Sequence, residues 1–83
     1  MQTAVRLPEL GAGDDEIRVS CWLVDLGDDV GVGDRIVELL IDGITFDLAA
    51  EQTGVLTRIE KSLDAIVRPG DILGWIETDE RTS

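Results

Sequence analysis

A short internal repeat limits the folds open to this chain more than any other feature of its sequence. Residues 30–36 and 67–73 share the pattern Val-x-x-Gly-Asp-x-(Ile/Leu) and begin 37 residues apart. Two similar turns would suffice for so short a match. The same spacing also pairs Trp22 with Ile59, however, so we expect two like halves. Each half of an 83-residue chain is too small for its own core, and the halves must bury their apolar faces against one another.

Turn signals recur about every 8 to 12 residues, which is typical of an all-β sandwich or barrel. The strands expected between them cover residues 4–7, 17–26, 35–41, 44–49, 55–60 and 72–77. In residues 17–26 apolar side chains fall on both faces, as in a strand that is buried on both sides or that carries a bulge. A helix is the rival interpretation there, although the β-branched content favours a strand. Residues 62–67 resemble one helical turn.

We expect a single domain over residues 1–83. Its core should lie in residues 4–78, and residues 79–83 should form a polar, frayed tail.

The most specific local signal is the dipeptide Asp42-Gly43, which lies between two apolar, partly β-branched runs. Both central residues of a type I′ turn need φ > 0, and Asp-Gly meets this requirement at low cost. Residues 38–48 are therefore expected to form two strands that fold back on each other, with Asp42 and Gly43 at the exposed tip.

The net charge of the chain limits the classes of partner that it is expected to bind. Eighteen acidic against seven basic residues give a formal charge of −11. Nucleic acids and anionic membranes both reward clustered Lys and Arg, so neither is an expected partner. The excess of acid fits a protein partner with a basic surface, although solubility alone would also account for it.

The chain has one cysteine and no histidine. These counts exclude an internal disulfide, a Cys-His nucleophile and the common imidazole metal sites, and no metal site is expected. Cys21 lies in an apolar run and is expected to be a small buried hydrophobe. A single unpaired cysteine, with no visible signal peptide and no apolar run of about 20 residues, favours the cytoplasm.

The order of the motifs resembles the lipoyl/biotinyl carrier domains, and among these the lipoyl domains of 2-oxo acid dehydrogenase complexes. The matching elements are Leu7-Pro8-Glu9-Leu10-Gly11, Trp22-Leu23-Val24, Gly27-Asp28-Asp29-Val30, Gly33-Asp34, Gly54-Val55-Leu56 and Val67-x-x-Gly70-Asp71-x-Leu73. The resemblance implies a barrel-sandwich hybrid, a flattened barrel of two four-stranded antiparallel sheets with a pseudo-twofold axis. It places the Asp42-Gly43 turn at one end of the barrel and its counterpart, Asp79-Glu80, at the other.

In the lipoyl family the exposed turn reads Asp-Lys-Ala, and its lysine carries lipoate through an amide bond; biotinyl domains have Met-Lys-Met. Here the turn is Asp42-Gly43-Ile44. Asp42 favours lipoyl over biotinyl ancestry. Gly43 has no amine, so no amide can form at that position, and the resemblance implies a vestigial attachment turn with no cofactor. The nearest other amine in sequence is Lys61, eighteen residues on, which we interpret as a solvated surface charge.

The flanks of this turn are also unusual for the family. Leu40 and Ile41 stand where an acid and a small hydroxyl residue are usual, and Ile44 replaces a small Ala. Two interpretations are open. The three residues form a small apolar patch that binds a partner, or they pack beneath the loop at residues 11–16.

The resemblance favours a protein-interaction module related to 2-oxo acid dehydrogenase complexes. In the family the loop that matches residues 11–16 lies beside the modified turn and helps the partner enzyme to recognise it. The residues expected to form an acidic face here are Asp14, Asp15, Glu16, Asp42 and Asp47. Such a face suits a basic dehydrogenase-complex or acyl-transfer subunit, or a lipoate-type ligase. The alternative is a site-altered form of a swinging-arm carrier.

An enzyme is the third possibility. Asp28 with Asp29, or Asp14 with Asp15 and Glu16, would have to act as an acid–base pair or a weak Ca²⁺ site. Adjacent acids on turns are ordinarily just solvated, and the sequence offers no nucleophile–base pair. We therefore expect no catalysis by this chain.

Overall fold

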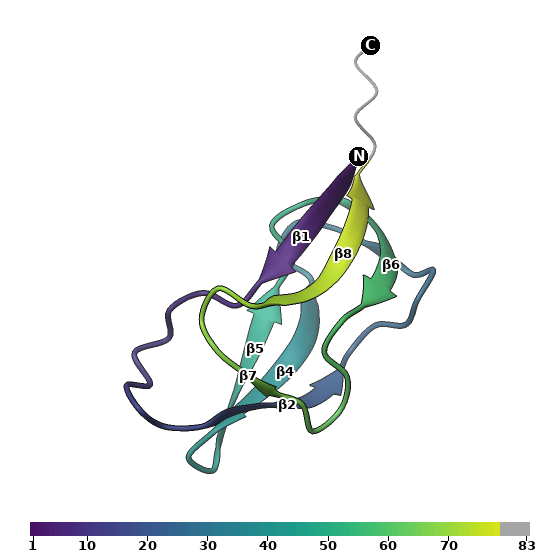
Figure 1. The fold of residues 1–83 in the computed structure, drawn as a ribbon. Coiled ribbons are helices and arrows are strands. Elements are labelled where there is room, and N and C mark those ends of the chain that lie inside the picture. Colours follow the sequence, from purple (N-terminus) through teal and green to yellow (C-terminus); the bar gives the residue numbers. More distant parts are fainter. Residues whose placement is uncertain (79–83) are drawn as a thin grey trace.

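A computed structural model describes residues 1–78, and within them the chain forms eight β-strands and no helix (Figure 1). The strands are β1 (Gln2–Arg6), β2 (Ile17–Trp22), β3 (Asp29–Val30), β4 (Arg35–Ile41), β5 (Ile44–Ala49), β6 (Gly54–Ile59), β7 (Ile66–Val67) and β8 (Ile72–Thr78). The all-β prediction is confirmed. The absence of a helix in this part of the chain means that no helical segment there could cross a membrane.

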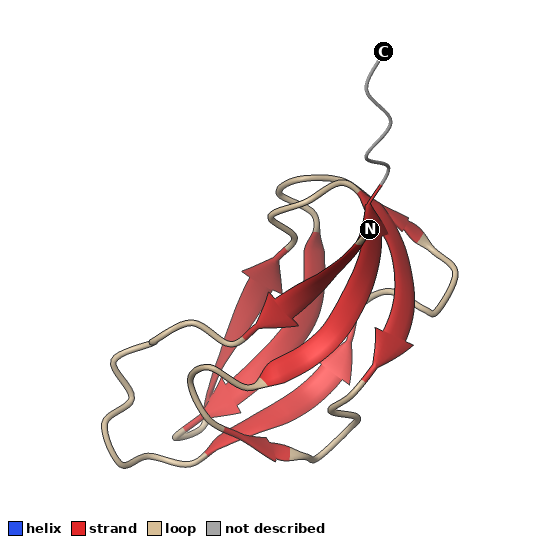
Figure 2. Cartoon of the chain, turned by 45° about the horizontal axis from the view of Figure 1, so that its top comes forward, coloured by secondary structure: helices blue, strands red, loops and turns tan. Residues whose placement is uncertain are grey.

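The strands form two four-stranded sheets, in the orders β1-β8-β6-β3 and β5-β4-β2-β7. Every strand pair is antiparallel. Figure 2 shows the sheets as two layers, and the core lies between them. Its largest fully buried side chains are aliphatic: Leu7, Ile36, Leu39, Leu56, Leu73 and Ile76. Such a core accounts for the high content of Val, Ile and Leu with few aromatics.

The two sheets are related by a pseudo-twofold axis, as the repeat predicted. Val19 of β2 pairs with Leu39 of β4, and Leu56 of β6 pairs with Ile76 of β8. Leu56 lies 37 positions after Val19, and Ile76 lies 37 positions after Leu39. A register shift follows Val19 in one sheet and Leu56 in the other, at equivalent places. The two halves therefore share even their bulges, and the bulge in β2 explains why its apolar side chains fall on both faces.

The repeated Gly-Asp motif forms the same turn twice. The Asp34 carboxylate accepts a hydrogen bond from the backbone N–H of Gly31 at 2.8 Å, and that of Asp71 accepts one from Arg68 at 2.9 Å. The glycine before each aspartate has a positive φ, 91° at Gly33 and 94° at Gly70, which other residues rarely adopt. The Val-x-x-Gly-Asp pattern thus reflects the conformation of a turn.

Several strand bounds differ from those expected. Strand β1 begins at Gln2 rather than at residue 4, and β2 ends at Trp22 rather than at residue 26. Beyond Trp22, Leu23 still donates to the Ile36 carbonyl at 2.8 Å, and the chain then turns away. The helical interpretation of residues 62–67 is wrong, because they form a turn that leads into β7.

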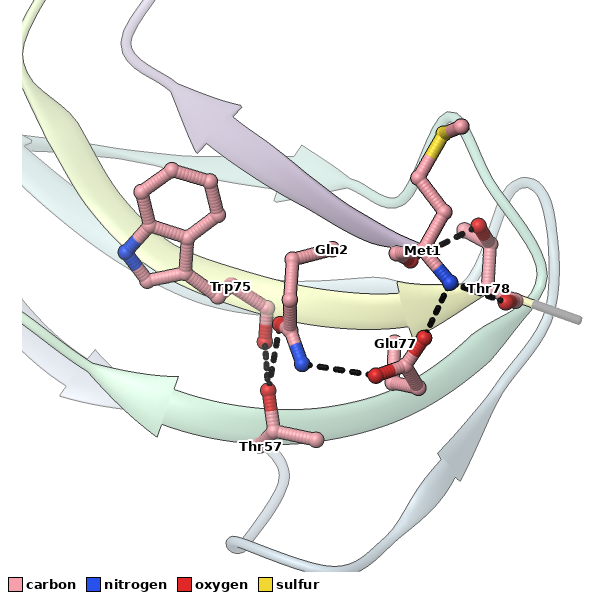
Figure 3. A network of polar contacts seen from close by, with 6 residues as sticks. All are labelled: Met1, Gln2, Thr57, Trp75, Glu77 and Thr78. Atoms are coloured by element: carbon pink, nitrogen blue, oxygen red, sulfur yellow. Dashed lines mark hydrogen bonds and ion pairs between the residues drawn. The ribbon is translucent and has the colours of Figure 1, made fainter.

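A polar network that was not predicted from the sequence joins β1 to the rest of its sheet (Figure 3). The Gln2 side chain donates to Glu77 at 2.8 Å and accepts a hydrogen bond from the Thr57 hydroxyl at 2.9 Å. The amino group of Met1 forms an ion pair with Glu77, and the Thr78 hydroxyl donates to the Met1 carbonyl at 3.0 Å. This network holds the barrel end that lies opposite the Asp42-Gly43 tip. The predicted counterpart of that tip, Asp79-Glu80, and the predicted tail lie outside the described residues.

Candidate functional site

The β4–β5 hairpin has the geometry that its Asp-Gly dipeptide predicted. Ile41 pairs with Ile44, which leaves Asp42 and Gly43 as a two-residue loop. Their φ angles are 49° and 76°, both positive as a type I′ turn requires. Both residues are exposed, and Figure 1 shows this tip at the end of the molecule away from β1's start. The exposed tip is therefore confirmed.

The space around Gly43 is open. Apart from its two chain neighbours, no atom of the described residues would lie within 4 Å of a Cβ atom built on this residue, so a side chain here would project into solvent. The position suits an exposed arm, but glycine supplies no group to which an arm could be joined.

The only lysine of the chain is differently placed. Lys61 is half-buried rather than fully solvated, and its backbone N–H donates to the Leu73 carbonyl at 3.1 Å. Its own carbonyl accepts a hydrogen bond from the indole N–H of Trp22 at 2.8 Å. These contacts fix the backbone of Lys61 against the barrel wall, unlike the free tip at Gly43.

The loop at residues 11–16 lies beside the tip. One hollow of about 320 Å³ is lined by both segments, with Asp15 and Glu16 from the loop and Asp42 and Gly43 from the turn, and Arg18 of β2 also lines it. Leu10 and Ala12 pack against the core and anchor the loop. The structure thus brings together two of the three acidic loop residues and the acid of the tip.

The other two predicted acidic residues do not line this hollow. Asp14 lines a neighbouring hollow, whose lining also includes Asp15, Glu16 and Arg68. Asp47 lies on the outer face of β5, opposite Glu38 of β4 and 3.8 Å from Arg35. Since the turn precedes Asp47 by five positions along an extended strand, its carboxylate cannot join the acidic hollow.

The three apolar residues around the tip do not behave as one unit, so neither interpretation holds for all of them. Ile41 is buried in the core, whereas Ile44 is 59% exposed. Leu40 is half-buried and lines the hollow between the loop and the tip. Of the three, only Leu40 therefore lies next to the loop at residues 11–16, as the packing interpretation expected of all of them.

Two of the acids considered for catalysis, Asp28 and Glu16, have structural contacts. The Asp28 carboxylate accepts the backbone N–H of Asp25 at 2.8 Å and so shapes the turn before β3. Glu16 forms an ion pair with Arg18. Within residues 1–78 the structure shows no group of three or more His, Cys, Asp or Glu side chains placed to hold a metal ion.

Cys21 is half-buried rather than buried, which corrects the prediction for this residue. Its thiol lies on the outer face of β2, with Sγ 3.9 Å from a carboxylate oxygen of Glu38. The same oxygen accepts a hydrogen bond from the Ser20 hydroxyl at 2.8 Å. Partial burial first, and then the negative charge of Glu38, raise the pKa of the Cys21 thiol above its ordinary value. The thiol is therefore kept protonated near neutral pH.

Taken together, the barrel-sandwich architecture and a tight, open turn beside an exposed loop define the class of domain that presents an attachment hairpin. Residues 3–76 match the biotin/lipoyl family, which is described as "Biotin-requiring enzyme". The chain belongs to this family.

Relatives and a solved structure narrow the likeness to lipoyl domains. The chain is 35% identical over 72 residues to the dihydrolipoyllysine-residue succinyltransferase component of the 2-oxoglutarate dehydrogenase complex of Bacillus subtilis. It is 36% identical over 72 residues to the acetyltransferase component of the pyruvate dehydrogenase complex of Mycobacterium tuberculosis. These matches cover 87% of the chain but only 17% and 13% of the relatives.

The lipoyl domain of the 2-oxoglutarate dehydrogenase complex of Azotobacter vinelandii has a similar fold. It superposes with a TM-score of 0.67 at 25% identity, over 95% of this chain and 99% of that domain. The predicted family and barrel-sandwich fold are therefore confirmed.

Proposed function

We propose that this chain is a lipoyl-type domain that carries no prosthetic group at its turn and serves as a protein-interaction module. The observation that carries the proposal is Gly43, which stands at the open tip of the attachment hairpin without an amine. Covalent lipoate needs a side-chain amine, so the residues of this turn do not fit that group. Lys61 supplies an amine, but its backbone is fixed on the barrel wall.

The surface around the tip supports a docking role. Asp15, Glu16 and Asp42 line one hollow with a single cation, Arg18, which is paired with Glu16, on a chain of net charge −11. An excess of acidic side chains in a concave site attracts a basic partner, which increases the association rate and the selectivity. The relatives are acyltransferase components of dehydrogenase complexes. We therefore assign as partners the basic surfaces of dehydrogenase-complex subunits, or a lipoate-type ligase, in the cytoplasm.

The first experiment is intact-mass analysis after incubation with a lipoate ligase, lipoate and ATP. The natural chain should keep its mass. The matched variants are Gly43→Lys, and Gly43→Lys combined with Lys61→Arg. A lipoyl adduct on both variants would show that the scaffold is competent and lacks only its acceptor, which favours the site-altered carrier. A lipoyl adduct on the natural chain would overturn the proposal.

The second experiment measures docking directly. The chain is titrated onto immobilised 2-oxoglutarate and pyruvate dehydrogenase complexes at low and at raised salt. Binding should weaken as salt rises, and Asp15→Asn with Glu16→Gln should weaken it further. Asp29→Asn is the control, because it removes one exposed charge that lies outside both the hollow and β5, and it should leave the affinity near that of the natural chain. Binding to neither complex, or binding unaffected by salt, would refute the docking role.

A further inference from the structure

Strand β5 is an open edge of its sheet. It is six residues long, and within residues 1–78 it pairs with β4 alone, in the order β5-β4-β2-β7. An edge strand exposes a row of backbone N–H and C=O groups that can pair with another strand. Among the described strands at sheet edges, β3 and β7 have two residues each, so β1 and β5 are the long edges.

The side of β5 that faces the core is apolar and incompletely covered. Phe46 pairs with Leu39 and Ile44 pairs with Ile41, and both partners are buried in the core. Yet Phe46 is 43% exposed and Ile44 is 59% exposed. The apolar layer of the barrel therefore continues past the covered core to the open edge.

The other long edge provides an internal comparison. Thr3 of β1 pairs with Ile76, which is the symmetry counterpart of Leu39, so Thr3 occupies in β1 the place of Phe46 in β5. Thr3 is half-buried and polar. Natural edge strands are protected by Pro, Lys or inward-pointing charges, and β5 has none of these in Ile44–Ala49. The apolar side of β5 thus has no such residue; among the described residues, the edge is protected only by Asp47 on its other side and by the register shift near Arg35 at its far end.

The outer face of β5 favours a partner strand with positively charged side chains. Its one charge, Asp47, lies directly opposite Glu38, and like charges opposed across a strand pair are destabilising. Arg35 offsets this only weakly, because its guanidinium is 3.8 Å from Asp47 and its side chain is 75% exposed. A cation beside Asp47 from the open side of β5 would be attracted, whereas a second copy of this chain would bring a further charge of −11.

We infer that β5 accepts an added strand from a basic partner protein, in which apolar side chains cover Ile44 and Phe46 and alternate Lys or Arg side chains lie beside Asp47. Main-chain hydrogen bonds between the two strands would supply affinity, and the alternation of apolar and basic side chains along the partner strand would supply selectivity. This surface is separate from the acidic hollow at the tip. The inference goes beyond the proposed function, and either can fail without the other.

The test uses the capped peptide Val-Lys-Val-Lys-Val-Lys-Val as the probe. Amide hydrogen exchange of the chain is followed by NMR with and without the peptide. Saturating peptide should slow exchange of the outward-directed β5 amides by about tenfold or more and leave those of β1 unchanged. Phe46→Lys should weaken binding by about tenfold or more, because it places a cation on the apolar side of the edge. Thr3→Lys, the symmetry-matched control, should leave the affinity unchanged.

Two further peptides serve as negative controls, one for the charge of the probe and one for its main-chain hydrogen bonds. The same sequence with Glu in place of Lys, or with alternate backbone nitrogens methylated, should not bind. Failure of the Lys peptide to bind, protection outside β5, or equal binding by Phe46→Lys would overturn the inference. Circular dichroism melts of both Lys variants confirm that each is folded. Sedimentation equilibrium that shows β5-dependent dimers, abolished by Phe46→Lys, would assign the edge to a second copy and would also overturn it.

Discussion

The indole ring of Trp22 lies against the backbone of Gly74. A Cβ atom built on Gly74 would be 2.9 Å from Cη2 of Trp22 and 2.7 Å from the carbonyl oxygen of Arg58. The pseudo-twofold axis relates Trp22 to Ile59 and Gly74 to Val37, because Trp22 pairs with Val37 and Ile59 pairs with Gly74. Trp22 is larger than its counterpart Ile59, and Gly74, against which it packs, is smaller than its own counterpart Val37. The small residue thus makes room for the large one.

This contact predicts the cost of adding one methyl group. Gly74→Ala should lower the free energy of unfolding by about 1–3 kcal/mol, because neither the indole nor the Arg58 carbonyl can move away freely. Urea unfolding measures this change. Gly31→Ala is the matched control, since a Cβ there would be 3.6 Å from Asp34, an ordinary contact, and its loss should be smaller. Equal losses would show that the ring does not pack against Gly74.

The repeated turns make a quantitative prediction about symmetry. Asp34→Ala and Asp71→Ala each remove one carboxylate that accepts a backbone N–H three residues earlier. Each should cost about 1–2 kcal/mol, and the two losses should agree within about 0.5 kcal/mol. The turns share no contacts, so the double variant should lose the sum. Urea unfolding of the two single variants and the double variant checks this, and clearly unequal single losses would mean that the two turns contribute differently to stability despite their shared geometry.

The sequence predicted the features that depend on local chemistry and on the repeat. Asp42-Gly43 specifies a turn by its φ angles, and Val-x-x-Gly-Asp specifies a turn by one side-chain hydrogen bond. Bulges were harder to place, because the residue inserted after Val19 leaves only an apolar pattern on both faces. The early end of β2 was missed for a related reason, since Leu23 and Leu26 are apolar yet exposed.

The acidic face was only partly predictable. Asp15, Glu16 and Asp42 come together because the loop before β2 packs beside the β4–β5 turn, and the family resemblance implied that packing. Asp47 was grouped with them by closeness in sequence. A strand advances about 3.3 Å per residue and alternates its faces, so five positions move a side chain well away from the tip. The exposed edge of β5 could not be read from sequence, because it depends on which strands cover it.

The positive φ at the tip predicts what a lysine there would cost. Gly43→Lys and Gly43→Ala should each lose about 1–2 kcal/mol of unfolding free energy, because a Cβ is disfavoured at a φ of 76° even in open space. Gly43→Asn should lose less, since Asn tolerates this conformation. Urea midpoints of the three variants test this. Losses that grew with side-chain size would indicate a steric contact rather than backbone strain.

The raised pKa of the Cys21 thiol predicts slow, pH-dependent alkylation. The rate with iodoacetamide should rise with a midpoint above the ordinary 9.0, whereas the urea-unfolded chain should titrate near the ordinary value. Glu38→Gln removes the nearby carboxylate, 3.9 Å from Sγ, and should lower the folded midpoint. Rates measured from about pH 7 to about pH 11 give these midpoints. Equal midpoints in the folded and unfolded chains would contradict the prediction.

The same pKa shift has a consequence for stability. Because the folded thiol holds its proton to higher pH than the unfolded one, the unfolded state loses the proton first as pH rises. Below the pKa of the unfolded thiol both states are protonated, and the thiol's contribution to the free energy of unfolding is fully present. This contribution is lost as pH rises from about 9 through the pKa of the folded thiol. Other groups titrate in this range, so the measurement is the difference in unfolding free energy between the natural chain and Cys21→Ala. That difference should decrease from about pH 8 to about pH 11, and a constant difference would show that the thiol titrates alike in both states.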